Sequence, residues 1–222
     1  MSCEKPLVSV FMITYNHEKY IAQAIEGVLM QKTDFHFELI IGEDCSTDRT
    51  REVVVDYANK YPEIIKPILH EKNVGAKANS KSVREACTGK YVAVCEGDDY
   101  WIDPLKLQKQ VDFLEAHRDC SGCHTRYKVV SEQNNEMGIS ALKKNPMVLE
   151  EVIVAPHIAS LTYVYRSNLQ KEMPDFSRSL WFGDWVAHIV HAQFGPIGYI
   201  RDITAAYRIN SNSATRSTDA RK

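Results

Sequence analysis

The chain has 222 residues, which is enough to bury a sizeable core as one domain. It is 44% hydrophobic and 25% charged with a formal net charge of −2, which is typical of a globular protein and gives no electrostatic footprint for bulk nucleic-acid binding. No run of about 20 apolar residues could span a bilayer, and the first residues lack the apolar segment of a signal peptide. We therefore expect a cytoplasmic protein without a transmembrane segment, in solution or in peripheral contact with the inner face of the membrane.

The first 117 residues alternate four predicted strands with four predicted helices. Continuous apolar, β-branched runs predict the strands, and apolar residues at helical spacing behind capping signals predict the helices. The strands are expected at residues 6–14, 37–41, 64–69 and 91–95. The helices are expected to begin after Asn16, at Ser46 or Thr47, after Gly75 and at Asp103-Pro104. Four such units predict an α/β fold with a mostly parallel sheet flanked by helices and wound by right-handed crossovers.

The order of elements changes near residue 120, which indicates a change of role within one domain. A strand is expected over residues 122–131, and a polar, poorly patterned insertion follows it. The next expected elements are a strand at 158–165, a helix at 185–194 and one or two short strands at 197–208. His188 and His191 lie three apart on that helix, and we interpret them as surface or packing residues rather than ligands.

Acidic residues gather where the predicted parallel strands end. Ligands bind beyond the carboxyl ends of the strands in such sheets, so these side chains are expected at one edge. They are Glu43, Asp44, Glu96, Asp98 and Asp99. Packing does not explain them, because unpaired carboxylates repel and are costly to desolvate. A divalent cation does, since Mg²⁺ and Mn²⁺ combine carboxylates with substrate phosphates. The alternative, for Asp44 or Asp48 alone, is a helix cap.

Other devices for holding a phosphate are absent from the sequence. No G-x-G-x-x-G motif follows the first strand, and no G-x-x-x-x-G-K-[ST] motif occurs. If the protein binds a diphosphate, we therefore expect a metal, basic side chains and backbone amides to hold it.

The order and spacing of these segments over residues 6–117 resemble the family 2 inverting glycosyltransferases of the GT-A fold. The matching segments are Thr14-Tyr15-Asn16, Glu43-Asp44-Cys45-Ser46-Thr47-Asp48, Asn73-Val74-Gly75 and Glu96-Gly97-Asp98-Asp99, with Gly183-Asp184-Trp185 and Tyr207-Arg208 in the second half. The resemblance implies a single GT-A-like domain. Residues 1–120 would form a Rossmann-like half that binds a nucleotide-sugar donor, residues 121–215 the acceptor-binding half, and residues 216–222 a flexible tail.

The resemblance also implies an activity and its partners. The donor would be a nucleoside-diphosphate sugar, by default a UDP-sugar, and the acceptor a hydroxyl of a saccharide or lipid-linked saccharide. Transfer would proceed with inversion, in the synthesis of a cell-surface polysaccharide or glycoconjugate. The cofactor would be Mn²⁺ or Mg²⁺.

Roles for single residues follow from the same resemblance. Glu96, Asp98 and Asp99 would hold the metal, with Glu96 in place of the usual aspartate. Arg208 would lie on a C-terminal flap over the diphosphate, and two residues later Asn210 replaces a histidine that members often have. The nucleotide-binding residues would be Thr14, Tyr15, Asn16, Glu43, Asp44, Lys77, Asn79, Asp98 and Arg208.

Asp184 matches the family's general base. Inversion requires that the acceptor hydroxyl lose its proton on the face opposite the leaving diphosphate, so the base must come from a different segment than the metal site. A helix cap is the alternative for Asp184. Ser160 and Trp185 are candidates for acceptor binding.

Two other classes of protein remain open. A nucleotidyltransferase has a similar sheet, but it is expected to carry a glycine-rich, arginine-bearing loop after the first strand, which this sequence lacks. A non-catalytic module with an acidic metal pocket would need no general base.

Overall fold

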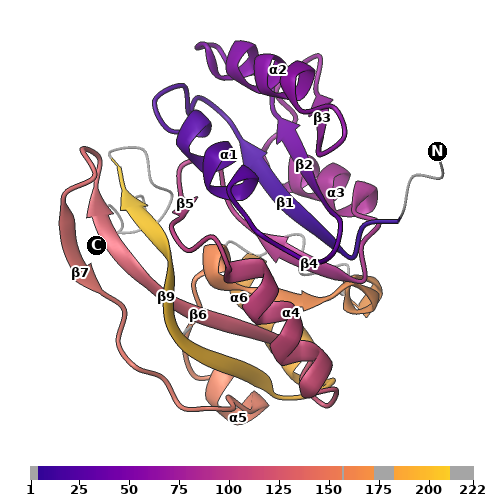
Figure 1. The fold of residues 1–222 in the computed structure, drawn as a ribbon, viewed down its shortest axis with the longest axis vertical. Helices are drawn as coiled ribbons and strands as arrows, with labels where there is room; N and C mark the ends of the chain where they lie inside the picture. Colours follow the sequence, from indigo (N-terminus) through magenta and orange to yellow (C-terminus); the bar gives the residue numbers. More distant parts are fainter. Residues whose placement is uncertain (1–4, 157, 173–182, 211–222) are drawn as a thin grey trace.

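The computed structural model describes residues 5–156, 158–172 and 183–210. Over these residues the chain forms a nine-stranded mixed sheet with helices packed against it (Figure 1). None of the described helices combines the length and the hydropathy that a membrane crossing requires. The flexible tail expected at residues 216–222, and residues 211–215 of the expected acceptor half, lie outside the described residues.

Four parallel strands form the N-terminal part of the sheet. Strand β1 (Val8–Thr14) lies between β2 (Phe37–Glu43) and β4 (Tyr91–Val94), and β3 (Ile65–Leu69) pairs with the outer side of β2. Their apolar, β-branched sequences are typical of strands that are buried on both faces. Because the four strands run in one direction, their carboxyl ends lie at the same edge of the sheet.

Strand β8 (Val164–Arg166) pairs antiparallel with β4 and continues the sheet into the second half of the chain. Beyond it follow β6 (Gly122–Ser131), β9 (Ile197–Ile209) and β5 (Tyr100–Trp101), while β7 (Glu136–Ile139) pairs with β6 outside this path. Strands β6 and β9 are parallel, and the other pairings here are antiparallel. The α/β class with a parallel first half is therefore confirmed, and the second half makes the sheet mixed.

Helices cover both faces of the sheet. They are α1 (Ile21–Leu29), α2 (Thr50–Lys60), α3 (Ala76–Ala86), α4 (Lys106–Ala116), α5 (Leu149–Val152) and α6 (Gly183–Ala192), with short 3-10 helices η1 (Ser160–Thr162) and η2 (Ser167–Glu172). Alternate residues of β1 point to opposite faces: Val10 and Met12 join one apolar cluster, and Phe11 joins the other. The first cluster includes residues of α1, α2 and α4, and the second includes residues of α3, α5 and α6.

The strand expected over residues 158–165 is wrong in its first part. The structure has η1 there, and only the short β8 follows. The carbonyl of Thr162 accepts a hydrogen bond of 3.0 Å from the side-chain amide of Gln110 on α4, so it is not available to a strand ladder. A side chain from another element therefore overrides the local β-branched pattern.

Two further boundaries differ from expectation. Helix α2 begins at Thr50 instead of Ser46 or Thr47, because the Ser46 amide donates to Glu43 Oε1 (2.7 Å) and closes a loop before the helix. The polar insertion after β6 contains β7 and α5, and residues 197–209 form one continuous strand. The strands expected at 37–41 and 122–131 are confirmed, the first extended to Glu43.

Candidate active site

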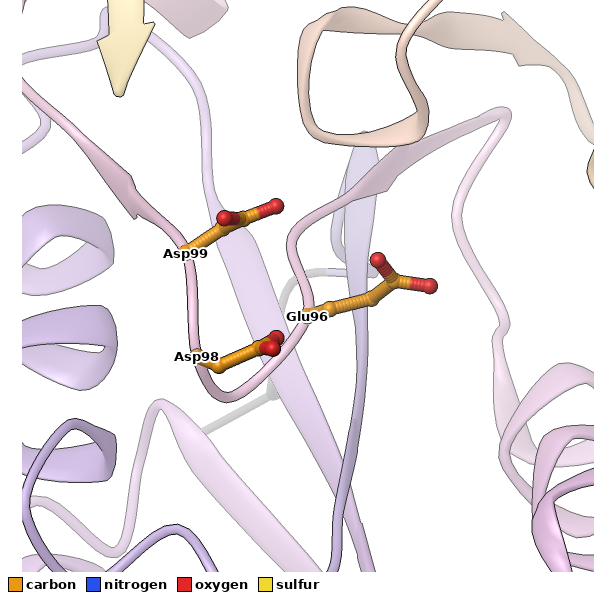
Figure 2. Close-up of side chains that lie close together, drawn as sticks. All are labelled: Glu96, Asp98 and Asp99. Atoms are coloured by element: carbon orange, nitrogen blue, oxygen red, sulfur yellow. The ribbon is translucent and has the colours of Figure 1, made fainter. Parts of the chain in front are cut away.

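A loop of four residues, Glu96-Gly97-Asp98-Asp99, follows β4 at the edge where the parallel strands end, and is called here the acid loop. One carboxylate oxygen from each of the three acidic residues lies within 4.8 Å of the others. Figure 2 shows the three side chains extending from this loop. A Cβ added at Gly97 would lie 2.7 Å from Thr14 Oγ1, so glycine lets the loop pass directly over the end of β1.

The acid loop concentrates negative charge. Burial raises the pKa of Glu96 and of Asp99 well above the usual range, and neighbouring carboxylates raise both further. No Lys or Arg side chain in the described part of the chain forms an ion pair with the three carboxylates. Closely spaced carboxylate oxygens without a cationic partner are the ligand set that Mg²⁺ or Mn²⁺ prefers. The residues present therefore fit a divalent cation.

The end of β9 fixes two of these carboxylates. The backbone N–H of Arg208 donates to Asp99 Oδ1 (2.7 Å), and Asn210 Nδ2 donates to Asp98 Oδ2 (2.9 Å). No site role is expected for Asn210 from the sequence, where it stands two residues after Arg208 in place of a histidine that family members often have. The structure places the side-chain amide of Asn210 at the acid loop.

Asp184, at the start of α6, lies beside the acid loop. The Ser160 hydroxyl donates to Glu96 Oε2 (3.3 Å), and it lies close enough to the Asp184 carboxylate to oppose the rise of its pKa. Burial, and then the charge of Asp184, raise the pKa of Glu96, and burial raises the pKa of Asp184, although its side chain reaches solvent. The structure thus brings together three residues that the sequence placed in separate roles.

The end of β1 carries three of the predicted nucleotide-binding residues. Thr14 is buried with its hydroxyl 3.2 Å from the ring of His17, whereas Tyr15 is exposed. Asn16 has a positive φ of 56°, a backbone region that asparagine tolerates better than most residues. Its N–H donates to Ser46 Oγ, so the loop after β1 is tied to the loop after β2.

Asp44 ties the loop after β2 to the start of α3. Its Oδ1 accepts from the Val74 N–H (2.7 Å) and its Oδ2 from the Gly75 N–H (2.9 Å). Lys77 follows in the first turn of α3 and is exposed. The segments that the sequence placed around a nucleotide therefore lie next to one another at the sheet edge.

Comparison with known proteins agrees with this arrangement. The model of the family described as "Glycosyl transferase family 2" matches residues 9–174. The chain belongs to glycosyl transferase family 2. An uncharacterised protein of Mycobacterium tuberculosis is 36% identical over 220 residues, which are 97% of this chain and 63% of that protein. TuaG of Bacillus subtilis, named as a teichuronic acid biosynthesis glycosyltransferase, is 30% identical over 94% of this chain and 81% of its own.

Solved structures show the same fold. S. aureus TarS in complex with UDP-GlcNAc matches with a TM-score of 0.74 and 23% identity, over 95% of this chain and 60% of that one. The mannosyltransferase PcManGT of Pyrobaculum calidifontis, in complex with GDP-Man and Mn²⁺, matches with a TM-score of 0.72 and 15% identity. The match covers 96% of this chain and 60% of that one. The GT-A-like fold is thereby confirmed. The chain spans 63% of the length of the mycobacterial relatives.

Five predicted nucleotide-binding residues of this family 2 chain are buried, namely Thr14, Glu43, Asp44, Asn79 and Arg208. Glu43 is fully buried and forms an ion pair with Arg51. Asn79 is 1% exposed and donates through Nδ2 to the Gly42 carbonyl (2.8 Å). Arg208 is 2% exposed. The polar groups of Glu43, Asn79 and Arg208 have partners within the protein in this arrangement, and their expected contact with a nucleotide stays a prediction.

The packing role expected of His188 and His191 is confirmed. Both are buried on α6, where His188 meets the Tyr163 ring edge-on at 4.7 Å and the His191 Nδ1 lies 3.1 Å from the Tyr163 hydroxyl. Burial lowers the pKa of each to about 3, so both rings are neutral at pH 7. Trp185 Nε1 donates to the Val152 carbonyl (2.7 Å) and links α6 to α5.

Proposed function

We propose that this chain transfers a sugar from a nucleoside-diphosphate sugar to a hydroxyl acceptor with inversion of the anomeric carbon. The observation that carries the proposal is the proximity of Asp184, at the start of α6, to Glu96 of the acid loop, whose pKa is raised by burial and then by the charge of Asp184. Inverting transfer needs a base on one side of the reacting carbon and stabilisation of the leaving diphosphate on the other. Family membership favours this reaction over a nucleotidyltransferase.

On the donor side, Asp98 and Asp99 would hold Mn²⁺ or Mg²⁺, with Glu96 as the third ligand. The cation would neutralise charge that develops on the leaving diphosphate. The donors of TarS and PcManGT, UDP-GlcNAc and GDP-Man, support a nucleotide sugar here, with UDP as the default nucleotide.

The loops at the sheet edge would bind the nucleoside. Asp44 would contact the base, beside the exposed Tyr15 and the Thr14 and Asn16 backbone, and Lys77 would approach the diphosphate or ribose. Glu43 and Asn79 would support these loops from beneath, because their side chains are buried.

On the acceptor side, Asp184 would take the proton of the attacking hydroxyl. Its raised pKa makes the carboxylate a stronger base near neutral pH. Ser160 would orient this carboxylate, and Trp185 would help to form the acceptor surface. The acceptor we propose is a saccharide or lipid-linked saccharide, in cell-surface polysaccharide or glycoconjugate synthesis at the cytoplasmic side of the membrane; the name of TuaG supports this class.

The test is a panel of nucleotide sugars and nucleoside diphosphates, scored by thermal shift and donor hydrolysis with Mn²⁺ or with EDTA. We expect at least one nucleoside diphosphate to raise the melting temperature only when the metal is present. If none does so, the donor-site proposal fails.

A second measurement separates an enzyme from a non-catalytic binding module. We expect Asp184→Asn to lower kcat by about a thousandfold or more, within the range set by general-base catalysis, while donor binding is retained. Asp202→Asn is the control, since Asp202 is an exposed partner of Lys109 away from the acid loop. Full transfer by Asp184→Asn would contradict the assignment of the base.

A further inference from the structure

The guanidinium of Arg208 is buried and donates hydrogen bonds to three segments of the chain. Its Nε donates to the Asp98 carbonyl (2.9 Å). Its Nη1 donates to the Glu132 carbonyl (3.3 Å) and to Asn134 Oδ1 (2.8 Å), both in the turn between β6 and β7. Its Nη2 donates to Gln23 Oε1 (2.7 Å) on α1. One side chain therefore joins the acid loop to α1 and to the tip of the β6–β7 hairpin.

Two tyrosine rings enclose the same guanidinium. Its central carbon lies 4.8 Å from the ring centroid of Tyr20 and 5.2 Å from that of Tyr100. Tyr20 is itself held, since its hydroxyl donates to Glu132 Oε1 (2.6 Å). A buried cation is costly unless hydrogen bonds and polarisable neighbours compensate it, and here carbonyl oxygens and aromatic faces do so. The guanidinium is thus held by contacts with two rings and by hydrogen bonds along its edge.

Arg208 also holds two consecutive residues of the acid loop. Its backbone N–H donates to the Asp99 carboxylate (2.7 Å), and its side chain donates to the Asp98 carbonyl (2.9 Å). The first bond sets the direction of one carboxylate, and the second sets the peptide plane between the two aspartates. A shift of the guanidinium is therefore transmitted to the peptide between the two aspartates, and a shift of the Arg208 backbone to the Asp99 carboxylate.

We propose that Arg208 is a positioning residue for the divalent cation: anchored between Tyr20 and Tyr100, it sets the acid loop in the geometry that binds the metal. The inference rests on the proposed function, because it takes the acid loop to be the cation site. It gives Arg208 a task other than contact with the diphosphate. Lysine could not perform it, because an ammonium lacks the planar fork that reaches several acceptors at once.

The test compares Arg208→Lys with the wild type by Mn²⁺ titration, followed by electron paramagnetic resonance of the free ion, alone and with UDP. Partners that orient metal ligands typically contribute 10- to 100-fold to affinity, so we expect Arg208→Lys to weaken Mn²⁺ binding by about tenfold or more. Activity should be recovered in part by excess Mn²⁺. Unchanged Mn²⁺ affinity in folded Arg208→Lys would overturn the inference.

Arg166→Lys is a matched control. Arg166 also donates to backbone carbonyls, those of Cys120 and Leu114 (both 2.8 Å), and also lies over a tyrosine ring, that of Tyr91 at 5.6 Å, but it does not touch the acid loop. A purely structural role predicts that both variants melt earlier and that both bind Mn²⁺ as the wild type does. Positioning predicts weaker Mn²⁺ binding only in Arg208→Lys.

Milder variants decide the question if Arg208→Lys does not fold. Gln23→Ala and Asn134→Ala each remove one acceptor of the guanidinium and leave its charge and rings in place. We expect the double variant to weaken Mn²⁺ binding about threefold, and unchanged binding would overturn the inference. If wild-type protein binds no Mn²⁺ in either condition, the proposed donor site itself fails, which is a different result.

Discussion

At the scale of single residues, Ser160 contacts carboxylates from both halves of the chain. Its hydroxyl has one proton and two carboxylate neighbours, Glu96 and Asp184, so it can donate to only one of them at a time. A bond from this hydroxyl favours the ionised form of whichever carboxylate receives it, and therefore lowers its pKa. Ser160 is thus placed to influence how readily Asp184 accepts a proton.

Replacing Ser160 by alanine tests this. We expect Ser160→Ala to lower kcat about tenfold, equivalent to about 1.4 kcal/mol, which is the size of one hydrogen bond to a charged group. The pKa of Asp184 should rise when the bond is lost, so the acidic limb of the pH–rate profile should move to higher pH. The donor KM should stay the same.

Ser82→Ala is the control for this variant, because the Ser82 hydroxyl donates to the Ala78 carbonyl within exposed α3. A Ser160→Ala enzyme with wild-type kcat and pH profile would show that the hydroxyl has no part in placing the base.

Lys106 shows which residue-level features the sequence could not predict. Its helical pattern suggests a surface lysine, yet the structure buries it completely, over the Trp101 ring at 4.3 Å and bonded to Gln110. Burial lowers its pKa to about 8. The Trp101 indole in turn donates to the Leu161 carbonyl in η1 (2.9 Å). Such a network depends on packing between distant segments, which no local pattern encodes.

At the scale of elements, α6 carries Asp184 and is anchored by neutral histidines. The pKa of His188 is lowered from 6.5 to about 3 by burial. Between these values the unfolded chain binds a proton that the folded chain does not, so stability falls as the pH falls through this window. The packing of the helix that carries Asp184 is therefore sensitive to acid.

Replacing His188 by glutamine should remove the contribution of His188 to the pH dependence of the free energy of unfolding. From pH 6.5 to about pH 4.5, we expect the free energy of unfolding of the wild type to fall by roughly 2 kcal/mol more than that of His188→Gln. Urea unfolding at a series of pH values measures the difference. Parallel pH profiles for the two proteins would show that His188 does not titrate in this way.

Sequence periodicity predicted the first four strands and the helices between them, because long apolar runs and capping signals are local. It did not predict β5 and β7, which have two and four residues and are held by pairing with β9 and β6. It also placed a strand where η1 stands, since the hydrogen bond from Gln110 comes from another element. Short elements that depend on contacts with other parts of the chain have no recognisable pattern in their own sequence.

At the scale of the whole molecule, α1 joins the two halves. A Cβ at Gly27 would lie 2.9 Å from the backbone nitrogen and oxygen of Trp101 in β5, and β5 pairs with β9. Only a glycine allows α1 to approach that strand so closely. Helix α1 is therefore packed backbone against backbone on β5, and β5 links it to β9.

We expect Gly27→Ala to lower the free energy of unfolding by roughly 2 kcal/mol, because overpacking against backbone costs more than the helical preference of alanine returns. Gly138→Ala is the control, since a Cβ at Gly138 meets nothing within 4 Å. Chemical denaturation measures both. A Gly27→Ala protein as stable as the wild type would show that α1 can move away from β5 without loss.

The candidate site was predictable only where its residues are contiguous. The acid loop was found because its three acidic residues lie within four positions at the end of one strand. The contact of Asn210 with Asp98 joins residues 112 positions apart, and the contact of Ser160 with Glu96 joins residues 64 apart. The hydrogen bonds of the Arg208 guanidinium were not predictable for the same reason, because its partners come from three distant segments.

The hydrogen bond between Arg208 of β9 and the acid loop has a consequence for the nascent chain during synthesis. Asp99 and Arg208 are 109 positions apart, so at about 5 to 20 residues per second the ribosome needs roughly 5 to 20 s to supply the second after the first. During that interval the parallel strands can assemble, but the carboxylates are not yet aligned. The nascent polypeptide would thus lack an aligned acid loop until β9 is made, and under the proposed function it would not consume activated sugar before then.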